Sequence, residues 1–460
     1  MDYLDHDGSG VKPLGLVFLI CMVVLTWKLP RRSAVFPLLI TTCYMPLGQM
    51  FVIGGLHFQF FRVVLLTGCL RVMSRNERND WKINYFDKVF IWWVVATLVL
   101  GTLAEFTMDR FINRAGEVIN ALGAYFLIRC WMRKFDDAVH VVRFLAVMIV
   151  PLAISMLVEK ITMRNIFAVF GGVPEFTGVR EGKLRCQGAF RHPILAGTYG
   201  VTAFPLFVGL WCLDPRARKR ALIGALCTIV VTVAASSSGA LLALMSEILG
   251  LMLWRTRQHM QLIRRSVVVV LVLLAMTMKA PVWYLFARLS EIAGGTGWYR
   301  SYLIDQAVVH FNEWWLVGST YTAHWAPAGE LTVGSPNNMD IVNHYVAEGL
   351  GGGIVKLGLF VTMIVIGYKT VGRWTRVVGE LLVSQKFFVW SLGVCLFGHC
   401  VSFMSVSYFD QIIVMWYWLL AVMSLLIAQY PTILQTNPAT VQGGRVVNLG
   451  GPGSAGLSPS

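Results

Sequence analysis

Long apolar runs alternate with short polar connections along almost the whole chain. A helix that crosses a bilayer needs about 20 mostly apolar residues. Thirteen runs are centred on residues 14–27, 35–51, 60–70, 89–103, 119–131, 142–157, 194–213, 222–235, 239–254, 267–278, 353–367, 387–404 and 412–430. Because several of these cores are short, the pattern predicts twelve to fourteen membrane-spanning helices, with thirteen as the preferred number. We therefore expect an all-α, polytopic membrane protein.

The composition excludes a set of soluble domains. Hydrophobic residues make up 56% of the chain and charged residues only 14%, whereas soluble proteins carry about 25% charged residues. Such a chain could not cover an aqueous surface without large exposed apolar patches. The net charge of +15 is explained by basic cytoplasmic loops, so no nucleic-acid partner is expected.

Positive charge gathers in alternate connections, which predicts the orientation. The basic connections lie at residues 28–32, 71–82, 129–143, 216–220, 255–265 and 369–386. Lys and Arg are enriched on the cytoplasmic side of membrane proteins. The pattern therefore predicts an outer N-terminus and an inner C-terminus. Residues 1–434 form the predicted membrane domain, and residues 435–460, rich in Gly, Pro, Ser and Asn, form a predicted disordered cytoplasmic tail.

Two predicted outer segments are longer than a simple connection, residues 159–193 and residues 279–352. The second is rich in aromatic residues. Within it, Leu303, Ala307, Val308 and Phe311 have helical spacing. We expect a large, partly helical outer loop with a helix at residues 299–315 lying at the membrane surface.

The segment 159–193 carries unusual positive charge for an outer loop. Its basic residues are Lys160, Arg164, Arg180, Lys183, Arg185 and Arg191. Arginine matches phosphate oxygens bidentately, which favours an anionic ligand. Ordinary pairing of loop charges is the alternative. Arg185 and Arg191 lie on either side of Gly188, close to a predicted helix start at Pro193, where anions bind readily.

Residues 185–193, RCQGAFRHP, resemble the R-x-x-G-x-F-x-x-P signature of the O-antigen ligase and polymerase family of bacterial membrane glycosyltransferases. Further segments follow in that family's order: SSSGA at 236–240, GGTGWYR at 294–300, WWLVG at 314–318, and DIVNHYVAEG at 340–349 before GGGIVKLGLF at 351–360. His192, Gly197 and Ser238 depart from common family residues. The resemblance covers residues 185–366.

The resemblance implies transfer of a glycan from undecaprenyl diphosphate to an acceptor. The reaction would be metal-independent and inverting, at the periplasmic face of the bacterial inner membrane. The fold would be similar to that of lipid-dependent membrane glycosyltransferases. Expected partners are the lipid-linked donor, a glycan or lipid A-core acceptor, and membrane lipids. Ligase and polymerase remain alternatives, with a preference for a polymerase or exopolysaccharide role because Asn343–His344 and Ser238 depart from the ligase-like pattern.

The candidate site residues follow from the resemblance and from their chemistry. A lipid diphosphate that leaves needs positive charge, for which Arg185 and Arg300 are the candidates, with Arg191 and Arg288 as auxiliaries. A general base must activate the acceptor hydroxyl. His344 suits this task by its ordinary pKa, and Asp340 and Glu348 are the alternatives. Asn343 and Tyr345, beside His344, are expected to contact substrate.

Several competing interpretations remain open. Asn343 and His344 could cap a helix, and His310 could be a polar residue on a surface helix. No Asp-x-Asp or histidine–carboxylate cluster is apparent on the outer side, so no metal or other cofactor is expected. A lipid-oligosaccharide flippase or other polysaccharide transporter is the alternative function. Against it, charges inside the runs are few, with Glu247 the clearest. A membrane assembly scaffold is a third possibility.

Overall fold

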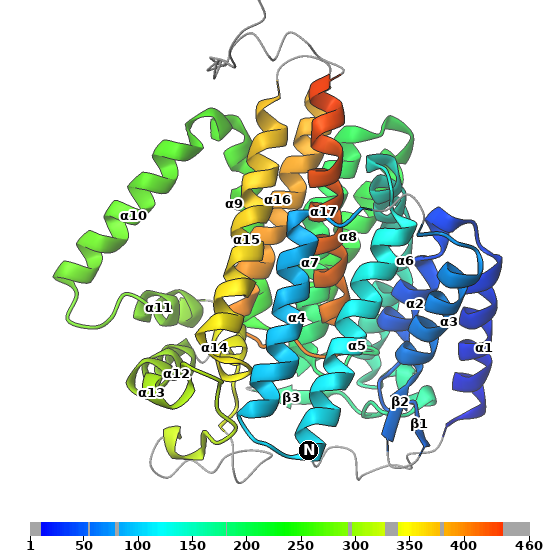
Figure 1. Cartoon of the computed structure of the whole chain (residues 1–460), viewed down its shortest axis with the longest axis horizontal. Helices are drawn as coiled ribbons and strands as arrows, with labels where there is room; N and C mark the ends of the chain where they lie inside the picture. Colours follow the sequence, from blue (N-terminus) through cyan, green and yellow to red (C-terminus); the bar gives the residue numbers. More distant parts are fainter. Residues whose placement is uncertain are drawn as a thin grey trace, which may run out of the picture.

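The computed structural model describes residues 11–53, 56–78, 82–180, 182–292, 297–326, 339–377 and 381–435, and these are mostly helical (Figure 1). The main helices are α1 (Pro13–Lys28), α2 (Phe36–Tyr44), α3 (Phe60–Ser74), α4 (Tyr85–Leu103), α5 (Met108–Trp131), α6 (Phe135–Thr162), α7 (Pro193–Leu213), α8 (Arg218–Ala234), α9 (Ser238–Met252), α10 (Met260–Thr277), α15 (Gly353–Arg376), α16 (Val383–Phe403) and α17 (Ile412–Gln435). Residues 436–460, the predicted disordered tail, lie outside the described residues.

Short elements lie between the main helices. Four helices follow α10 in the chain: α11 (Tyr284–Ile292), α12 (Gly297–Val309), α13 (Phe311–Trp314) and α14 (His344–Leu350). The strands within the described residues form two antiparallel hairpins, β1 (Met50–Ile53) with β2 (Leu56–Gln59), and β3 (Gly178–Arg180) with β4 (Lys183–Arg185). Helices α11–α14 lie at the lower end of the bundle in Figure 1, and the C-terminal end of α17 lies at the upper end.

Seven segments of the described chain are long and apolar enough to cross a membrane. They are Tyr85–Leu103, Phe135–Thr162, Pro193–Leu213, Ser238–Thr277, Gly353–Arg376, Val383–Phe403 and Ile412–Tyr430. The protein is therefore an all-α, polytopic membrane protein. The other predicted runs lie in helices that are shorter, such as α1 and α3, or more polar, such as α5.

One predicted span is wrong in its extent. The run at 35–51 forms a helix only from Phe36 to Tyr44, and its end leads into β1. Pro46 and Gly48 follow directly, and neither supports a continuing helix. The predicted helix at 299–315 is present as α12 and α13, interrupted at His310.

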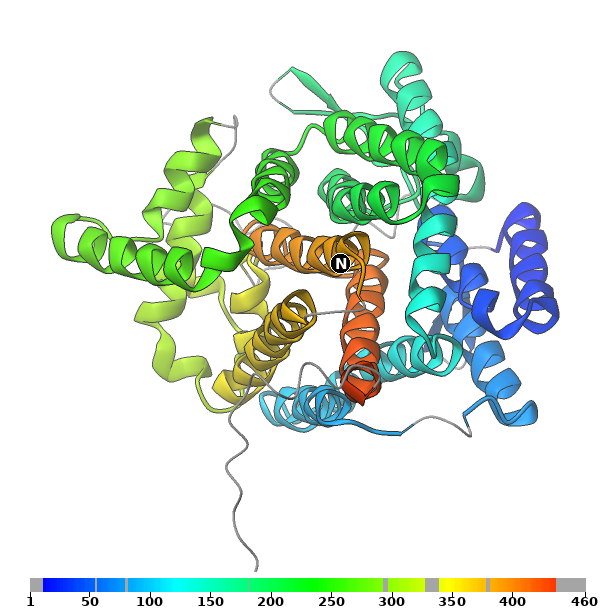
Figure 2. The ribbon, with the colours of Figure 1, turned by 90° about the horizontal axis from the view of Figure 1, so that it is seen from above.

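The core of the bundle is built around α7 and α17. Helix α7 packs against α8, α9 and α16, and α17 buries most of its apolar residues, including Trp416 and Trp418. Figure 2 shows this arrangement along the bundle axis. By contrast, α10 has no buried residue and projects from the bundle in both views. An apolar helix with this exposure is typical of a lipid-facing segment.

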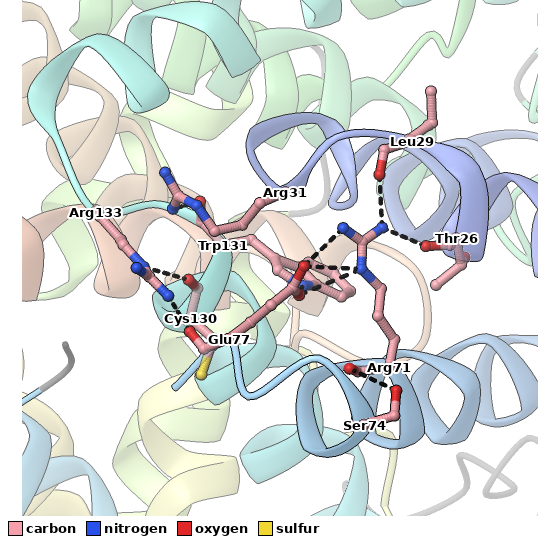
Figure 3. A network of polar contacts seen from close by, with 9 residues as sticks. All are labelled: Thr26, Leu29, Arg31, Arg71, Ser74, Glu77, Cys130, Trp131 and Arg133. Atoms are coloured by element: carbon pink, nitrogen blue, oxygen red, sulfur yellow. Dashed lines mark hydrogen bonds and ion pairs between the residues drawn. The ribbon is translucent and has the colours of Figure 1, made fainter. Parts of the chain in front are cut away.

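Several charges that enter the bundle are paired there. Arg71, only 1% exposed, donates to the Glu77 carboxylate at 2.8 Å and to the Leu29 carbonyl oxygen at 2.8 Å (Figure 3). The Trp131 indole donates to the same carboxylate at 3.0 Å. A buried charge without a partner is costly. The network therefore ties the last turns of α1, α3 and α5 together.

Candidate functional site

A buried carboxylate folds the 185–193 segment into its turn. Glu159, near the end of α6, accepts the backbone N–H groups of Gln187 at 3.1 Å and Gly188 at 2.9 Å, and the Thr177 hydroxyl at 3.2 Å. Gly188 has φ +57°, a conformation that favours glycine. The glycine of the motif is thus explained by local backbone geometry.

The rest of this motif starts α7. Pro193 occupies the first turn, as predicted, and the His192 Nδ1 atom accepts the Ile194 N–H at 3.2 Å as the helix cap. Phe190 is fully buried, with its ring 5.2 Å from that of Tyr199. These residues hold the segment in place and leave Arg185 and Arg191 as its charged members.

Arg185 comes together with Arg300 and Arg180. Arg300 lies on α12 and is only 8% exposed. Burial, followed by the positive charges of Arg180 and Arg185, lowers the pKa of Arg300 to about 10. These three residues are called the arginine cluster below. Like charges held together repel, so an anion that binds among them is favoured.

The arginine cluster borders the first turn of α9. A methyl group placed at Gly239 would lie 3.7 Å from an Arg300 guanidinium nitrogen and would collide with the Ser405 hydroxyl. Ser405 belongs to the connection between α16 and α17, residues 404–411. The cluster therefore lies beside one end of this connection.

A cavity of about 740 Å³ is lined by Tyr408–Gln411, the other end of the same connection. Its walls come from α2–α5, α14 and residues 408–414. Its ionisable lining residues are Arg62, Arg110, Arg114, Glu117, Arg191, His344, Glu348, Lys356 and Asp410. Of the predicted residues, His344, Glu348 and Arg191 line this cavity, whereas Arg185 and Arg300 lie outside its lining.

Glu348 is the best-placed carboxylate in the cavity. It is 4% exposed and accepts the Trp93 indole N–H at 2.6 Å. The Lys356 Nζ atom lies 3.6 Å from the same carboxylate. Burial raises the pKa of Glu348, although Lys356 and Trp93 oppose this effect. A carboxylate with a raised pKa is suited to accept a proton near neutral pH.

Both ring nitrogens of His344 face other groups of the protein. Its Nδ1 atom accepts the backbone N–H of Tyr408 at 3.1 Å, so the proton of the neutral ring is on Nε2. Nε2 faces Glu348 at 3.6 Å. Burial, and then Lys356 and His399, lower the pKa of His344 to about 3. This geometry leaves no ring nitrogen lone pair for an acceptor hydroxyl and favours Glu348 as the base.

The other predicted site residues contact other protein groups or are exposed. Asn343 caps α14 by accepting the Val346 N–H at 3.2 Å, and the Tyr345 hydroxyl donates to the Cys400 carbonyl oxygen at 3.2 Å. Arg191 lies 3.5 Å from Asp410. Asp340 and Arg288 are exposed and lie outside the cavity lining. Asn343 and Tyr345 thus make structural contacts.

Sequence reasoning missed the connection 404–411. Tyr408 bonds to His344, Asp410 pairs with Arg191, and the Gln411 side chain donates to the Ala189 carbonyl oxygen at 2.7 Å. It also missed the cavity residues Arg110 and Arg114. A possible signal was the short polar stretch Ser405–Gln411 between two strongly apolar runs.

The expectation of no histidine–carboxylate cluster on this side is wrong. His310, Glu313 and His324 offer ligand atoms that all lie within 4.8 Å of one another. His310 and Glu313 are three residues apart, a visible helical spacing, but His324 joins them only through the fold.

The fold and the cavity together define a polytopic membrane protein with a charged, partly buried site at one end of its helix bundle. No protein-family model matches the chain, and no curated protein matches it significantly.

Replacing Gly188 with alanine should destabilise the protein. The positive φ alone costs about 1–2 kcal/mol for a residue with a Cβ atom, and that atom would lie 3.2 Å from a Leu152 methyl group. Thermal unfolding of the purified protein in detergent measures the loss. Gly178→Ala is the matched control, because its Cβ atom would meet nothing within 4 Å. Equal melting temperatures for the two variants would contradict this account of the motif glycine.

Proposed function

We propose that this protein is a membrane glycosyltransferase of the O-antigen ligase or polymerase type. It would move a glycan from undecaprenyl diphosphate to an acceptor hydroxyl, either on a growing glycan or on lipid A-core. The observation that carries the proposal is the buried Glu348 carboxylate, which lies in a cavity with several cationic side chains. The resemblance of residues 185–366 supplies the substrate class.

The proposed chemistry is one inverting displacement. The acceptor oxygen forms a bond to the anomeric carbon while the bond to the lipid diphosphate breaks, and the diphosphate leaves with the electron pair. Glu348 takes the hydroxyl proton, and His344 and Trp93 hold the carboxylate in position. The arginine cluster stabilises the negative charge of the leaving diphosphate, so this step requires no metal ion.

The two parts of the proposed site are close together. Ser405 borders the arginine cluster through Gly239, and Tyr408 bonds to His344. Three residues of extended chain span at most about 11 Å. The cluster and the carboxylate thus flank one short connection, which supports a donor lying on one side of it and an acceptor in the cavity.

The proposal includes a location and an orientation. Helices α11–α14 and the cavity would face the periplasm of a bacterium, and the end of α17 would face the cytoplasm, as the alternating basic connections indicate. The total would be at least twelve spans, because α1, α3, α5 and α8 add to the seven longer segments and one of these, Ser238–Thr277, contains two helices, α9 and α10.

A transporter or flippase is the second candidate, favoured by Glu247. This residue on α9 is fully buried, and neither carboxylate oxygen has a hydrogen-bond partner among the described residues. Ionisable residues inside membrane helices are common on ion and substrate pathways. Glu247→Gln separates the candidates: loss of lipid-linked glycan movement across vesicles with intact transfer would favour the transporter.

Glu348→Gln should lower single-turnover transfer by about 10²–10⁴, because the general base is lost. His344→Asn should cost about tenfold or less, because its Nε2 atom lies 3.6 Å from the carboxylate, too far for a full hydrogen bond, which would itself contribute only about 0.5–1.5 kcal/mol. Binding of the lipid-linked donor, measured in parallel, should change little in either variant. Glu117→Gln, in the same cavity but with a side chain 53% exposed, is the matched control. If Glu348→Gln turned over at a near-normal rate while His344→Asn were inactive, the histidine and not Glu348 would be the general base.

Arg300→Lys should reduce transfer by about 10²–10³, since it keeps a charge but loses the bidentate fork that stabilises the leaving diphosphate. Arg288→Lys, on exposed α11, should behave like wild type. Single-turnover rates with saturating donor provide the comparison. A wild-type rate for Arg300→Lys would reject the arginine cluster as the diphosphate site.

The pH profile should identify the base independently. Glu348 has a raised pKa, so kcat/KM should fall on the acid side as this carboxylate becomes protonated. His344, with its pKa near 3, stays neutral and should add no ionisation near pH 6.5. The acid limb should therefore survive in His344→Asn. Its disappearance in that variant would show that the limb belongs to the histidine.

A further inference from the structure

A second group of chemically capable side chains lies on the loop helices, outside the cavity lining. The His310 Nδ1 atom is 2.7 Å from Glu313 Oε1, and the His324 Nε2 atom is 2.9 Å from Glu313 Oε2. The two histidines come from opposite sides of α13: His310 precedes it, and His324 lies in the 3₁₀ turn Ala323–Trp325. The Glu313 carboxylate lies between them.

The surroundings hold these side chains in their orientations. The Trp325 indole donates to Glu313 Oε2 at 3.2 Å, and its ring stacks on His310 with centroids 5.3 Å apart. Tyr321 stacks on His324 at 5.2 Å. A hydrogen bond to a ligating carboxylate and fixed imidazole planes are what metal sites use to orient their ligands.

We propose that His310, Glu313 and His324 form a site for one divalent transition-metal ion, with Zn²⁺ as the best fit. Two imidazoles and one carboxylate with an open fourth position form a common tetrahedral zinc set. Ligand atoms around such an ion are about 3.3 Å apart, given metal–ligand distances of about 2.0 Å. The three ligand atoms already lie within 4.8 Å of one another, so small side-chain movements close the site.

The metal would stiffen one wall of the cavity. The segment between α13 and His324 includes Ser319, Thr320 and Thr322, all cavity-lining residues. Its start is held by the Ser319 N–H, which donates to the Leu350 carbonyl oxygen at 3.0 Å. A metal that joins His324 to His310 and Glu313 would fix its other end to α13. The site is thus a positioning element and takes no part in transfer.

Metal binding can be measured on the full-length protein in detergent, without any transfer assay. After removal of metal with a chelator, Zn²⁺ is titrated in competition with a chromophoric chelator. We expect one tight equivalent for wild type, tetrahedral ligand-field absorption when Co²⁺ is used instead, and a rise in melting temperature with Zn²⁺. His324→Ala and Glu313→Gln should lose the equivalent, the absorption and the rise.

The control is His259→Ala, which removes an exposed histidine from a separate part of the chain and should bind Zn²⁺ like wild type. If the wild-type protein takes up no Zn²⁺ beyond the level of Glu313→Gln, or if His324→Ala keeps the equivalent, the site is wrong and the three residues form only an ion pair. Because the readouts are uptake, absorption and melting, failure here leaves the proposed transfer reaction untouched.

Discussion

Charged side chains inside this apolar bundle are stabilised by partners there, because an isolated buried charge costs several kcal/mol. Glu247, which has no hydrogen-bond partner among the described residues, is an exception. Several of the ion pairs and hydrogen bonds that join helices follow from this constraint. Arg71 with Glu77 joins the ends of α1, α3 and α5. Asp87, fully buried, accepts the Tyr125 hydroxyl at 2.6 Å and the Ser424 hydroxyl at 2.7 Å, which ties α4 to α5 and α17. The same rule gives Glu348 its partners Trp93 and Lys356.

The connection 404–411 contacts both parts of the proposed site. It reaches the arginine cluster through Ser405, the His344 ring through Tyr408 and the 185–193 segment through Gln411. Segments as far as 222 residues apart in the chain are thus joined by hydrogen bonds between a side chain and the backbone. A small displacement of this connection would therefore move Glu348 and the arginine cluster relative to each other, which in the proposed reaction would couple the positions of donor and acceptor.

The sequence predicted what local chemistry decides, and it missed what only tertiary contacts decide. Apolar runs located the helices, except where Pro46 and Gly48 end α2, and the start of α7 at Pro193 is confirmed. The i,i+4 relation correctly placed Glu348 beside His344. Which of these two residues is the better candidate for the proposed general base depends on the Tyr408 N–H, which lies 64 residues from His344 in the chain. Hydrophobic periodicity gives no information on such a contact. The joining of His324 to His310 and Glu313 was invisible for the same reason.

The two basic parts of the proposed site differ in their surroundings, and the proposed function gives them different ligands. In the cavity, Arg114 pairs with Glu117 at 2.6 Å and Arg191 lies 3.5 Å from Asp410, so part of the positive charge is already neutralised by protein carboxylates. Such a lining suits a polar, largely uncharged acceptor that forms hydrogen bonds. In the arginine cluster, burial and then the positive charges of Arg180 and Arg185 lower the pKa of Arg300, which means that these surroundings disfavour its charged form. By linkage, an anion that binds there raises that pKa again. Under the proposed function, the diphosphate would therefore lie at the arginine cluster, and the Glu348 carboxylate, which would repel it, on the side of the acceptor.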